Sequence, residues 1–344
     1  MKEFIGYKNG VNLGGWISQS NYEKEHLENF ITEKDVENIA SWGCDHVRLP
    51  FDYNVILDEN NVVSADAFKY LDRCVGWCEK FGLNIILDLH KTLGYSFDKG
   101  ECENGFFEDK KYQEIFMTMW REIAAHYADK ADHVAFELLN EITDRKFAIP
   151  WNSIAARTVR EMRAVAPDNF ILIGGIFNNS IFGLTLLDKP CDEKIVFNFH
   201  YYNPLVFTHQ KAPWIDMMKP DCDVNYPDTK EIYCKKTMEN LGSDHVRSLE
   251  SFGGEVIDAS FMEWEMSVAK EVSEKLDVPI YCGEYGVIDR VPDETLLRWY
   301  SDVSSVFDKL NIGRAAWTYR QKDFGITDPC REKILPDILG FLRA

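Results

Sequence analysis

The sequence predicts a (β/α)8 TIM barrel, an α/β fold, with a subdomain inserted after the sixth strand. Eight short apolar segments recur along the 344 residues, and helical patterns lie between them. No glycine-rich phosphate fingerprint follows the first segment, which argues against a doubly wound sheet. We expect residues 1–344 to form a single catalytic domain without a linker.

The predicted strands are mostly continuous apolar runs, which is typical of strands buried on both faces. They are VNLGGWIS from Val11, DHVRLPF from Asp45, NIILDLH from Asn84, HVAFELLNE from His133, NFILIGG from Asn169, IVFNFHYY from Ile195, PIYCGEYG from Pro279 and GRAAWTYR from Gly313.

Helix signals separate these runs. ITEKDVENIASWG opens on Thr32, with Asp35 three positions later as a weak capping box, and ends at Gly43; FKYLDRCVGWCEKFG ends at Gly82. Five further helices are predicted over residues 109–130, 152–166, 263–276, 293–310 and 334–342.

A long segment of roughly residues 203–262 separates the sixth strand from its helix and is rich in proline. We interpret it as a subdomain inserted in a βα loop, on the upper face of the barrel, where functional loops gather.

The formal net charge of -19 argues against nucleic acid and anionic membranes as partners, because both require clustered cations. Neutral ligands such as sugars suit an acidic chain with 13% aromatic residues, and we expect a monomer. The start, MKEFIGYKNG, has no apolar run of signal-peptide length. We therefore expect a cytoplasmic protein, or a secreted one if a leader was removed.

The nine cysteines are odd in number and lack paired CxxC spacing, so neither a disulfide framework nor a zinc site is predicted. We expect most of these nine, which are Cys44, Cys74, Cys78, Cys102, Cys191, Cys222, Cys234, Cys282 and Cys330, to be reduced and buried. Cys74 and Cys78 lie one helical turn apart beside Leu71 and Val75, which indicates a core-facing stripe.

Functional groups of such barrels come from the C-terminal ends of different strands. The residues that close the apolar runs here are Arg48, His90, Asn140, Glu141, His200, Tyr202, Glu284 and Trp317. Each one alone could be structural, as a loop cap, a core histidine or a packed tryptophan. Because six strands deliver such groups to one rim, we interpret the set as a site.

Glu141 and Glu284 each follow a hydrophobic run and must be partly desolvated. Two carboxyl groups in different environments can act as a proton donor and an ionised partner, as cleavage of a glycosidic bond requires. We expect Arg48 to keep Glu284 ionised, and burial with the nearby negative charge to raise the pKa of Glu141.

Other polar residues of the strands have a structural interpretation. Glu137 shares the strand parity of Glu141 but lies deeper, so we expect a buried ion pair or hydrogen bond, and we interpret Asp88 and Asp45 in the same way. The histidines and carboxylates could in principle bind a metal, but HxH and HExxH spacings are absent. No metal and no cofactor are expected.

Seven motifs in order resemble glycoside hydrolase family 5, a retaining family of clan A built on this barrel, and most closely its clostridial endoglucanase C type. They are GVNLGGWIS, HVRLPFDY, LDLH, FELLNE, FNFHYYNP, YCGEYGV and AAWTY, and THQKAPW opens the insertion in the same way. The resemblance covers essentially the whole chain.

The resemblance implies that Glu141 is the acid/base and Glu284 the nucleophile, with their carboxyl groups about 5 Å apart. Asn140 would bind the sugar 2-hydroxyl, and Arg48 and Tyr202 would position Glu284.

It also implies that His90 and His200 line the subsite around the scissile bond and that Trp317 is a platform under a sugar ring. Ile142 departs from the family pattern, in which proline often follows Asn-Glu, so the resemblance does not predict the conformation of the loop after Glu141. Four aromatic residues could extend the cleft or simply pack: Trp16, Trp151, Phe207 and Trp214.

The expected function is a retaining endo-β-1,4-glucanase acting on cellulose-like or mixed-linkage β-glucan. A mannanase and an exo-β-1,3-glucanase are alternatives with the same chemistry. A non-catalytic sugar-binding barrel and a metal-dependent hydrolase are alternatives from other classes.

Overall fold

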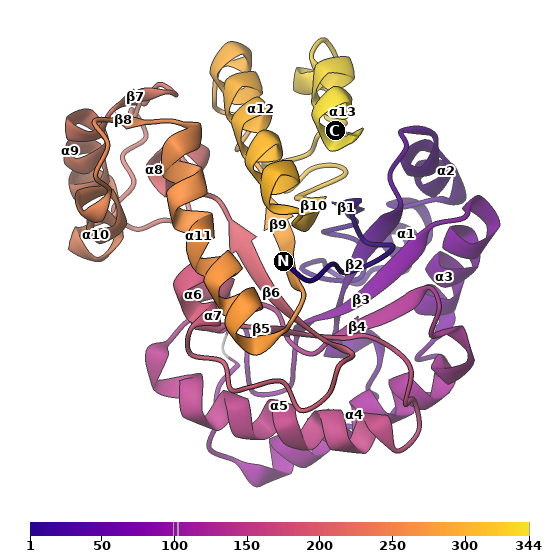
Figure 1. Ribbon diagram of the computed structural model, residues 1–344. Coiled ribbons are helices and arrows are strands. Elements are labelled where there is room, and N and C mark those ends of the chain that lie inside the picture. Colours follow the sequence, from indigo (N-terminus) through magenta and orange to yellow (C-terminus); the bar gives the residue numbers. More distant parts are fainter. Residues whose placement is uncertain (99, 102, 344) are drawn as a thin grey trace.

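A computed structural model describes residues 1–344 except 99, 102 and 344, and it shows the predicted barrel (Figure 1). Eight parallel strands close in the order β1-β10-β9-β6-β5-β4-β3-β2. Their bounds are β1 Asn9–Asn12, β2 His46–Asp52, β3 Asn84–Lys91, β4 Val134–Glu137, β5 Ile171–Gly174, β6 Ile195–Tyr201, β9 Ile280–Tyr285 and β10 Gly313–Ala316. The predicted fold class is confirmed.

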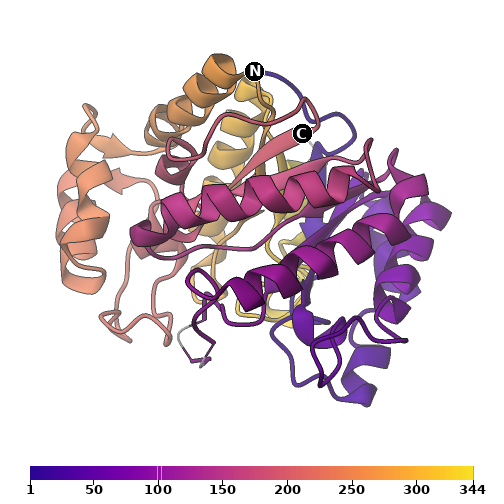
Figure 2. The same cartoon turned by 90° about the horizontal axis from the view of Figure 1, so that it is seen from below.

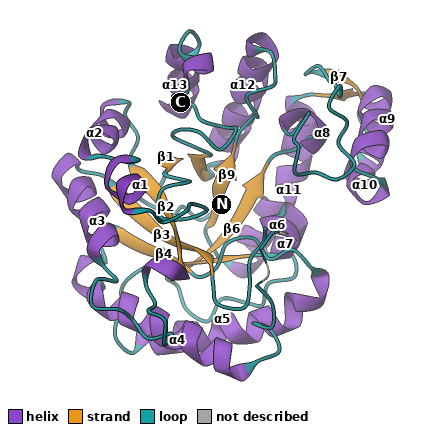
Figure 3. Ribbon diagram, turned by 180° about the vertical axis from the view of Figure 1, so that it is seen from behind, coloured by secondary structure: helices purple, strands orange, loops and turns teal. Residues whose placement is uncertain are grey.

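Helices surround the strands as a ring (Figures 1 and 3). They are α1 Lys24–Asn29, α2 Glu33–Ser41, α3 Lys69–Phe81, α4 Lys110–His126, α5 Ala148–Arg163, α6 Ile176–Asn179, α7 Ile181–Leu184, α11 Ala259–Leu276, α12 Asp293–Leu310 and α13 Leu335–Arg343. The predicted capping box joins Thr32 and Asp35, and Gly82 ends α3 with a φ of 72°. After β5, two four-residue helices replace the long helix that follows most other strands.

Two predicted strands are shorter than the apolar runs that suggested them. β1 ends at Asn12, before the turn at Gly14 and Gly15, and β4 ends at Glu137. Leu138 still donates its backbone N–H to Leu172 at 3.1 Å, and the Asn140 N–H reaches Leu89 at 2.9 Å. The chain therefore stays hydrogen-bonded to both neighbouring strands as far as Asn140, although the regular ladder has ended.

The segment between β6 and α11 holds α8 (Leu205–Thr208), β7 (Asp228–Thr229), α9 (Lys230–Asn240), α10 (Ser243–Ser251) and β8 (Val256–Ile257). β7 and β8 pair as a small antiparallel sheet. The α9–α10 hairpin stands beside α11, outside the helix ring and to one side of the barrel (Figures 1 and 2). α10 is joined to α11 by the hydrogen bond from the Ser248 hydroxyl to Glu265.

The inside of the barrel changes from apolar to polar along its axis. At the N-terminal end, Phe4 and Tyr7 stack at 4.1 Å and close the barrel over inward residues such as Ile86 and Val196. Because side chains alternate along a strand, the next inward position of β3 is Asp88. The polar layer above this apolar floor carries the candidate site.

The predicted stripe of cysteines is confirmed, since Cys74 and Cys78 are fully buried. Eight cysteines of the described chain are free, and Cys102 lies outside the described residues. None of the described helices combines the length and apolarity needed to cross a membrane.

Candidate active site

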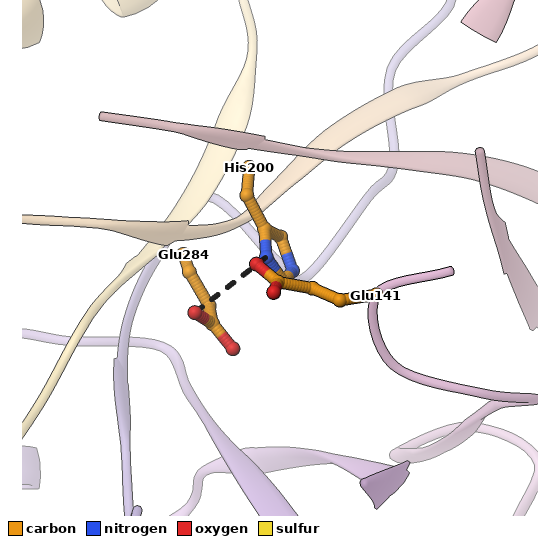
Figure 4. A group of neighbouring side chains, drawn as sticks. All are labelled: Glu141, His200 and Glu284. Atoms are coloured by element: carbon orange, nitrogen blue, oxygen red, sulfur yellow. Dashed lines mark hydrogen bonds and ion pairs between the residues drawn. The ribbon is translucent and has the colours of Figure 1, made fainter. Parts of the chain in front are cut away.

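Glu141, four residues after the end of β4, and Glu284 of β9 face each other at the C-terminal end of the barrel (Figure 4). One oxygen of each carboxyl group and a ring nitrogen of His200 all lie within 4.8 Å of one another. Retaining glycosidases hold their two carboxyl groups about 5–5.5 Å apart, whereas inverting enzymes need at least about 6.5 Å. The spacing fits the retaining geometry.

Glu284 is bound by donors on both of its oxygens. Arg48 Nη1 donates to Oε1 at 2.8 Å, and the Tyr202 hydroxyl donates to Oε2 at 2.9 Å. Burial and the neighbouring carboxylates raise the pKa of Tyr202 well above its ordinary value, so the hydroxyl keeps its proton. These two donors hold the Glu284 carboxyl group in a fixed orientation.

A β-bulge in β9 directs Glu284 into the site. Phe199 pairs with Cys282 and His200 with Glu284, so Gly283 is the extra residue. Its N–H donates to Asn198 Oδ1 at 2.8 Å, and its carbonyl accepts from Asn12 Nδ2 at 2.9 Å. A Cβ on Gly283 would lie 2.8 Å from Asn198, so glycine is needed at this close approach.

Glu141 has a different environment. His200 Nδ1 lies 2.8 Å from Oε1, and Asn178 Nδ2 donates to Oε2 at 3.0 Å. Burial raises the pKa of Glu141, while the Asn178 bond acts against the rise. Its carbonyl accepts from the Tyr95 hydroxyl at 2.9 Å. Glu141 is thus suited to carry a proton beside an ionised partner.

His200 lies between the two carboxylates, and burial lowers its pKa to about 4. Its Nδ1 is 3.5 Å from Glu284, and Asn179 Nδ2 lies 3.3 Å from its Nε2. A neutral imidazole that accepts from Asn179 has its proton on Nδ1 and donates it to Glu141.

The sequence predicts Arg48 at a strand end, but in the structure it is the third residue of the seven-residue β2. The apolar run continues past it because Arg48 points inward, where its Nε and Nη2 donate to both oxygens of Glu137 at 2.7 and 2.8 Å. Asp88 lies 3.0 Å from Nη2. The predicted buried roles of Glu137 and Asp88 are confirmed, and burial raises the pKa of Asp88 to about 7.

Asn140 and the aromatic residues complete the surroundings. Asn140 Oδ1 accepts from Arg48 at 3.0 Å, and its buried Nδ2 has no partner among the described residues. Trp317 follows β10 directly and stacks on His90 at 5.5 Å, and His90 Nδ1 is bound to Asp88 at 2.7 Å. Of the four outer aromatics, three are fully buried in the core and one is about half exposed: Trp16, Trp151 and Phe207, against Trp214.

Four asparagines at the site were not identified from the sequence: Asn12, Asn178, Asn179 and Asn198. Asn178 and Asn179 lie shortly after the fifth apolar run, behind Ile176 and Phe177, so the strand-end criterion could have found them. Ile142, the departure from the family pattern, forms a parallel bridge with Ile176, and its carbonyl accepts from the Asn178 N–H at 3.0 Å. The loop after Glu141 is therefore tied to the residue that contacts its carboxyl group.

Glu141, His200 and Glu284 are also the group of described residues whose donor atoms are close enough to share a metal ion. One imidazole and two carboxylates would suit Zn²⁺. In this site, however, the Arg48 guanidinium already provides a positive charge 2.8 Å from Glu284. The arrangement can perform acid/base and nucleophilic chemistry with its own side chains.

Comparison with known proteins places the chain in a family of glycoside hydrolases. The family described as Cellulase (glycosyl hydrolase family 5) matches residues 7–323. Cellodextrinase A of Ruminococcus flavefaciens is 41% identical over 309 residues, which cover 90% of this chain and 84% of that protein. Endoglucanase C of Acetivibrio thermocellus is 37% identical over 342 residues, 98% of each chain.

Solved structures share the fold. An endoglucanase from the hyperthermophilic Thermotoga maritima superimposes with a TM-score of 0.76 over 97% of this chain and 96% of that one, at 23% identity. The likeness supports the barrel fold.

Proposed function

This chain belongs to glycosyl hydrolase family 5 and is an endo-β-1,4-glucanase type of glycoside hydrolase, and we propose that Glu141 and Glu284 carry out its double displacement. The observation that supports these roles is the approach of the two carboxyl groups within 4.8 Å at the strand ends. A pair this close lets one group attack the sugar while the other protonates the leaving oxygen.

In the first step, Glu284 attacks the anomeric carbon, and Glu141 gives its proton to the departing glycosidic oxygen. Arg48 and Tyr202 hold the attacking carboxylate in place by their 2.8 and 2.9 Å bonds. In the second step, Glu141 removes a proton from water, which attacks the glycosyl-enzyme and restores Glu284. Each attack inverts the anomeric carbon, so two attacks retain its configuration.

The sugar is held by Asn140 and Trp317 in this proposal. The free Nδ2 of Asn140 lies on the residue next to the acid and would donate to the 2-hydroxyl. Trp317, supported from one side by His90, would offer an aromatic surface to the sugar ring. The substrate is a cellulose-like or mixed-linkage β-glucan or its oligosaccharides, and the enzyme acts as a monomer.

The roles are tested with Glu141→Gln and Glu284→Gln, with the exposed Glu122→Gln of α4 as the matched control. We expect kcat on carboxymethylcellulose to fall by at least roughly 100-fold in both site variants and to stay unchanged in the control. If either site variant kept parent activity, the role of that residue would be refuted.

Two further measurements test the reaction and the substrate. Proton NMR of cellopentaose hydrolysis should show the β-anomer first, and initial release of the α-anomer would exclude retention. Lichenan and carboxymethylcellulose should be cut in preference to laminarin and mannan. Cleavage of laminarin or mannan alone would refute the glucan linkage but not the two-carboxylate mechanism.

A further inference from the structure

Glu265 is a buried carboxyl group that the proposed mechanism does not use. It lies on α11, its side chain is 8% exposed, and burial raises its pKa. Among the described residues, the groups that bind it and influence its pKa are the neutral side chains of Ser248, Asn203 and Tyr201. A buried carboxyl group is costly enough to need such partners.

These donors come from both sides of Tyr202. The Tyr201 hydroxyl donates to Glu265 Oε2 at 3.0 Å, and Asn203 Nδ2 donates to its two oxygens at 2.9 and 3.0 Å. Ser248 of α10 donates to Oε1. One carboxyl group therefore binds the residues before and after Tyr202, together with the inserted hairpin.

Tyr202 needs such support because the sheet no longer holds it. β6 ends at Tyr201, which forms the last pair with β9, opposite Tyr285. Beyond that pair, the backbone is held by side chains: Trp299 Nε1 donates to the Asn203 carbonyl at 3.0 Å. The hydroxyl of Tyr202 must nevertheless reach Glu284 to within 2.9 Å.

We infer that Glu265 is a positioning residue for the reaction, which acts by holding both neighbours of Tyr202 so that the tyrosine hydroxyl stays on Glu284. This inference rests on the proposed role of Glu284 as nucleophile. It also gives the insertion a mechanical link to the catalytic centre, because Ser248 of α10 is bound to the same carboxyl group. A movement of α10 relative to α11 would therefore shift the position of Tyr202.

The test is a double-mutant cycle between Glu265→Ala and Tyr202→Phe, with kcat and KM measured on cellopentaose. Misplacement of a catalytic group by 1 Å can cost about 100-fold in rate, so we expect kcat of Glu265→Ala to fall roughly 10- to 100-fold with KM little changed. In the Tyr202→Phe background, Glu265→Ala should cause no further loss of kcat. A purely structural role would give losses that multiply.

Two variants sharpen this result. Glu265→Gln keeps an acceptor for Tyr201 and Asn203, and its amide can donate to the Ser248 hydroxyl, so kcat should recover to within a few-fold of the parent. Glu271→Ala, at an exposed position on the same helix, is the matched control and should leave kcat unchanged. If Glu265→Ala did not fold, as judged by circular dichroism, Tyr201→Phe/Asn203→Ala would remove the bonds between Glu265 and the two neighbours of Tyr202 from the other side.

Unchanged kcat in Glu265→Ala, or multiplicative losses in the cycle, would overturn the inference. An inactive parent enzyme, or an active Glu284→Gln, would instead refute the proposed function. The two failures are therefore distinguishable.

Discussion

Removing the Asn178 side chain should move the pH profile of the enzyme in a defined direction. Asn178 donates to Glu141 Oε2 at 3.0 Å, and this bond acts to lower the pKa of the carboxyl group. Glu141 must be protonated to act as the acid, so activity falls as pH rises through its pKa. Loss of the donor raises that pKa, and the basic limb of kcat/KM should move to higher pH.

The size of the shift follows from the bond. A hydrogen bond to a charged group is worth about 1.5–3 kcal/mol when buried, and Asn178 is exposed, so we take about 1 kcal/mol. At 1.36 kcal/mol per pKa unit, this corresponds to a shift of about 0.5–1 pH unit. Asn178→Gly is the appropriate variant, because Asn178 has a φ of 55° and glycine adopts it without strain.

The assay is kcat/KM on a chromogenic cellobioside from pH 4 to 9. Phe177→Gly is the matched control: Phe177 also has a φ of 55° and is adjacent, but its side chain does not donate to Glu141. We expect no shift in the control. A basic limb that stayed in place or moved to lower pH in Asn178→Gly, or an equal shift in both variants, would refute the reasoning.

Three other outcomes are expected. Arg48→Lys should lower the free energy of unfolding, measured in urea, by about 3–5 kcal/mol, because it leaves buried carboxylates unpaired. The exposed control Arg121→Lys should change it by less than about 0.5 kcal/mol, and equal effects of the two variants would contradict the buried network. The ring of His200, with a pKa of about 4, should stay neutral in histidine-selective NMR between pH 5 and 8, and titration near pH 6.5 would argue against its burial. Because this folded-state pKa lies below the ordinary value of about 6.5, His200 should reduce the stability of the protein as pH falls from 6.5 to 4. Treatment with EDTA should leave kcat unchanged, and a loss restored by Zn²⁺ would support the metal-dependent alternative instead.

The sequence was sufficient for the barrel and for the meeting of distant groups at one rim. Once the apolar runs are assigned to a closed parallel barrel, their C-terminal ends must lie together, so Glu141 and Glu284 are expected to be neighbours although they are 143 positions apart in the sequence. Tyr202 and His200 follow from the same rule, and both contact the carboxylates.

Other features depend on pairing that a single sequence does not reveal. In the sequence, Asn12 and Asn198 lie within apolar runs, and nothing there marks them as part of the site. In the structure they bind the carbonyl and the N–H of Gly283 at the bulge. Arg48 was placed at a strand end because inward and outward positions cannot be distinguished when both faces are buried. Glu265 resembles a surface glutamate of an amphipathic helix in the sequence, whereas in the structure Tyr201, Asn203 and Ser248 bind its buried carboxyl group.

The polar layer inside the barrel has a consequence for how this protein can evolve or be engineered. Three carboxylates form ion pairs with the Arg48 guanidinium there: Asp88, Glu137 and Glu284. Glu284 is the proposed nucleophile, and the other two hold the arginine that binds it. Hydrophobic replacement of such a network often makes a protein more stable. Here hydrophobic replacement of this network would remove the groups that the reaction needs. Active variants selected for heat resistance should therefore carry their substitutions in the outer helices and loops, and the polar layer should stay unchanged.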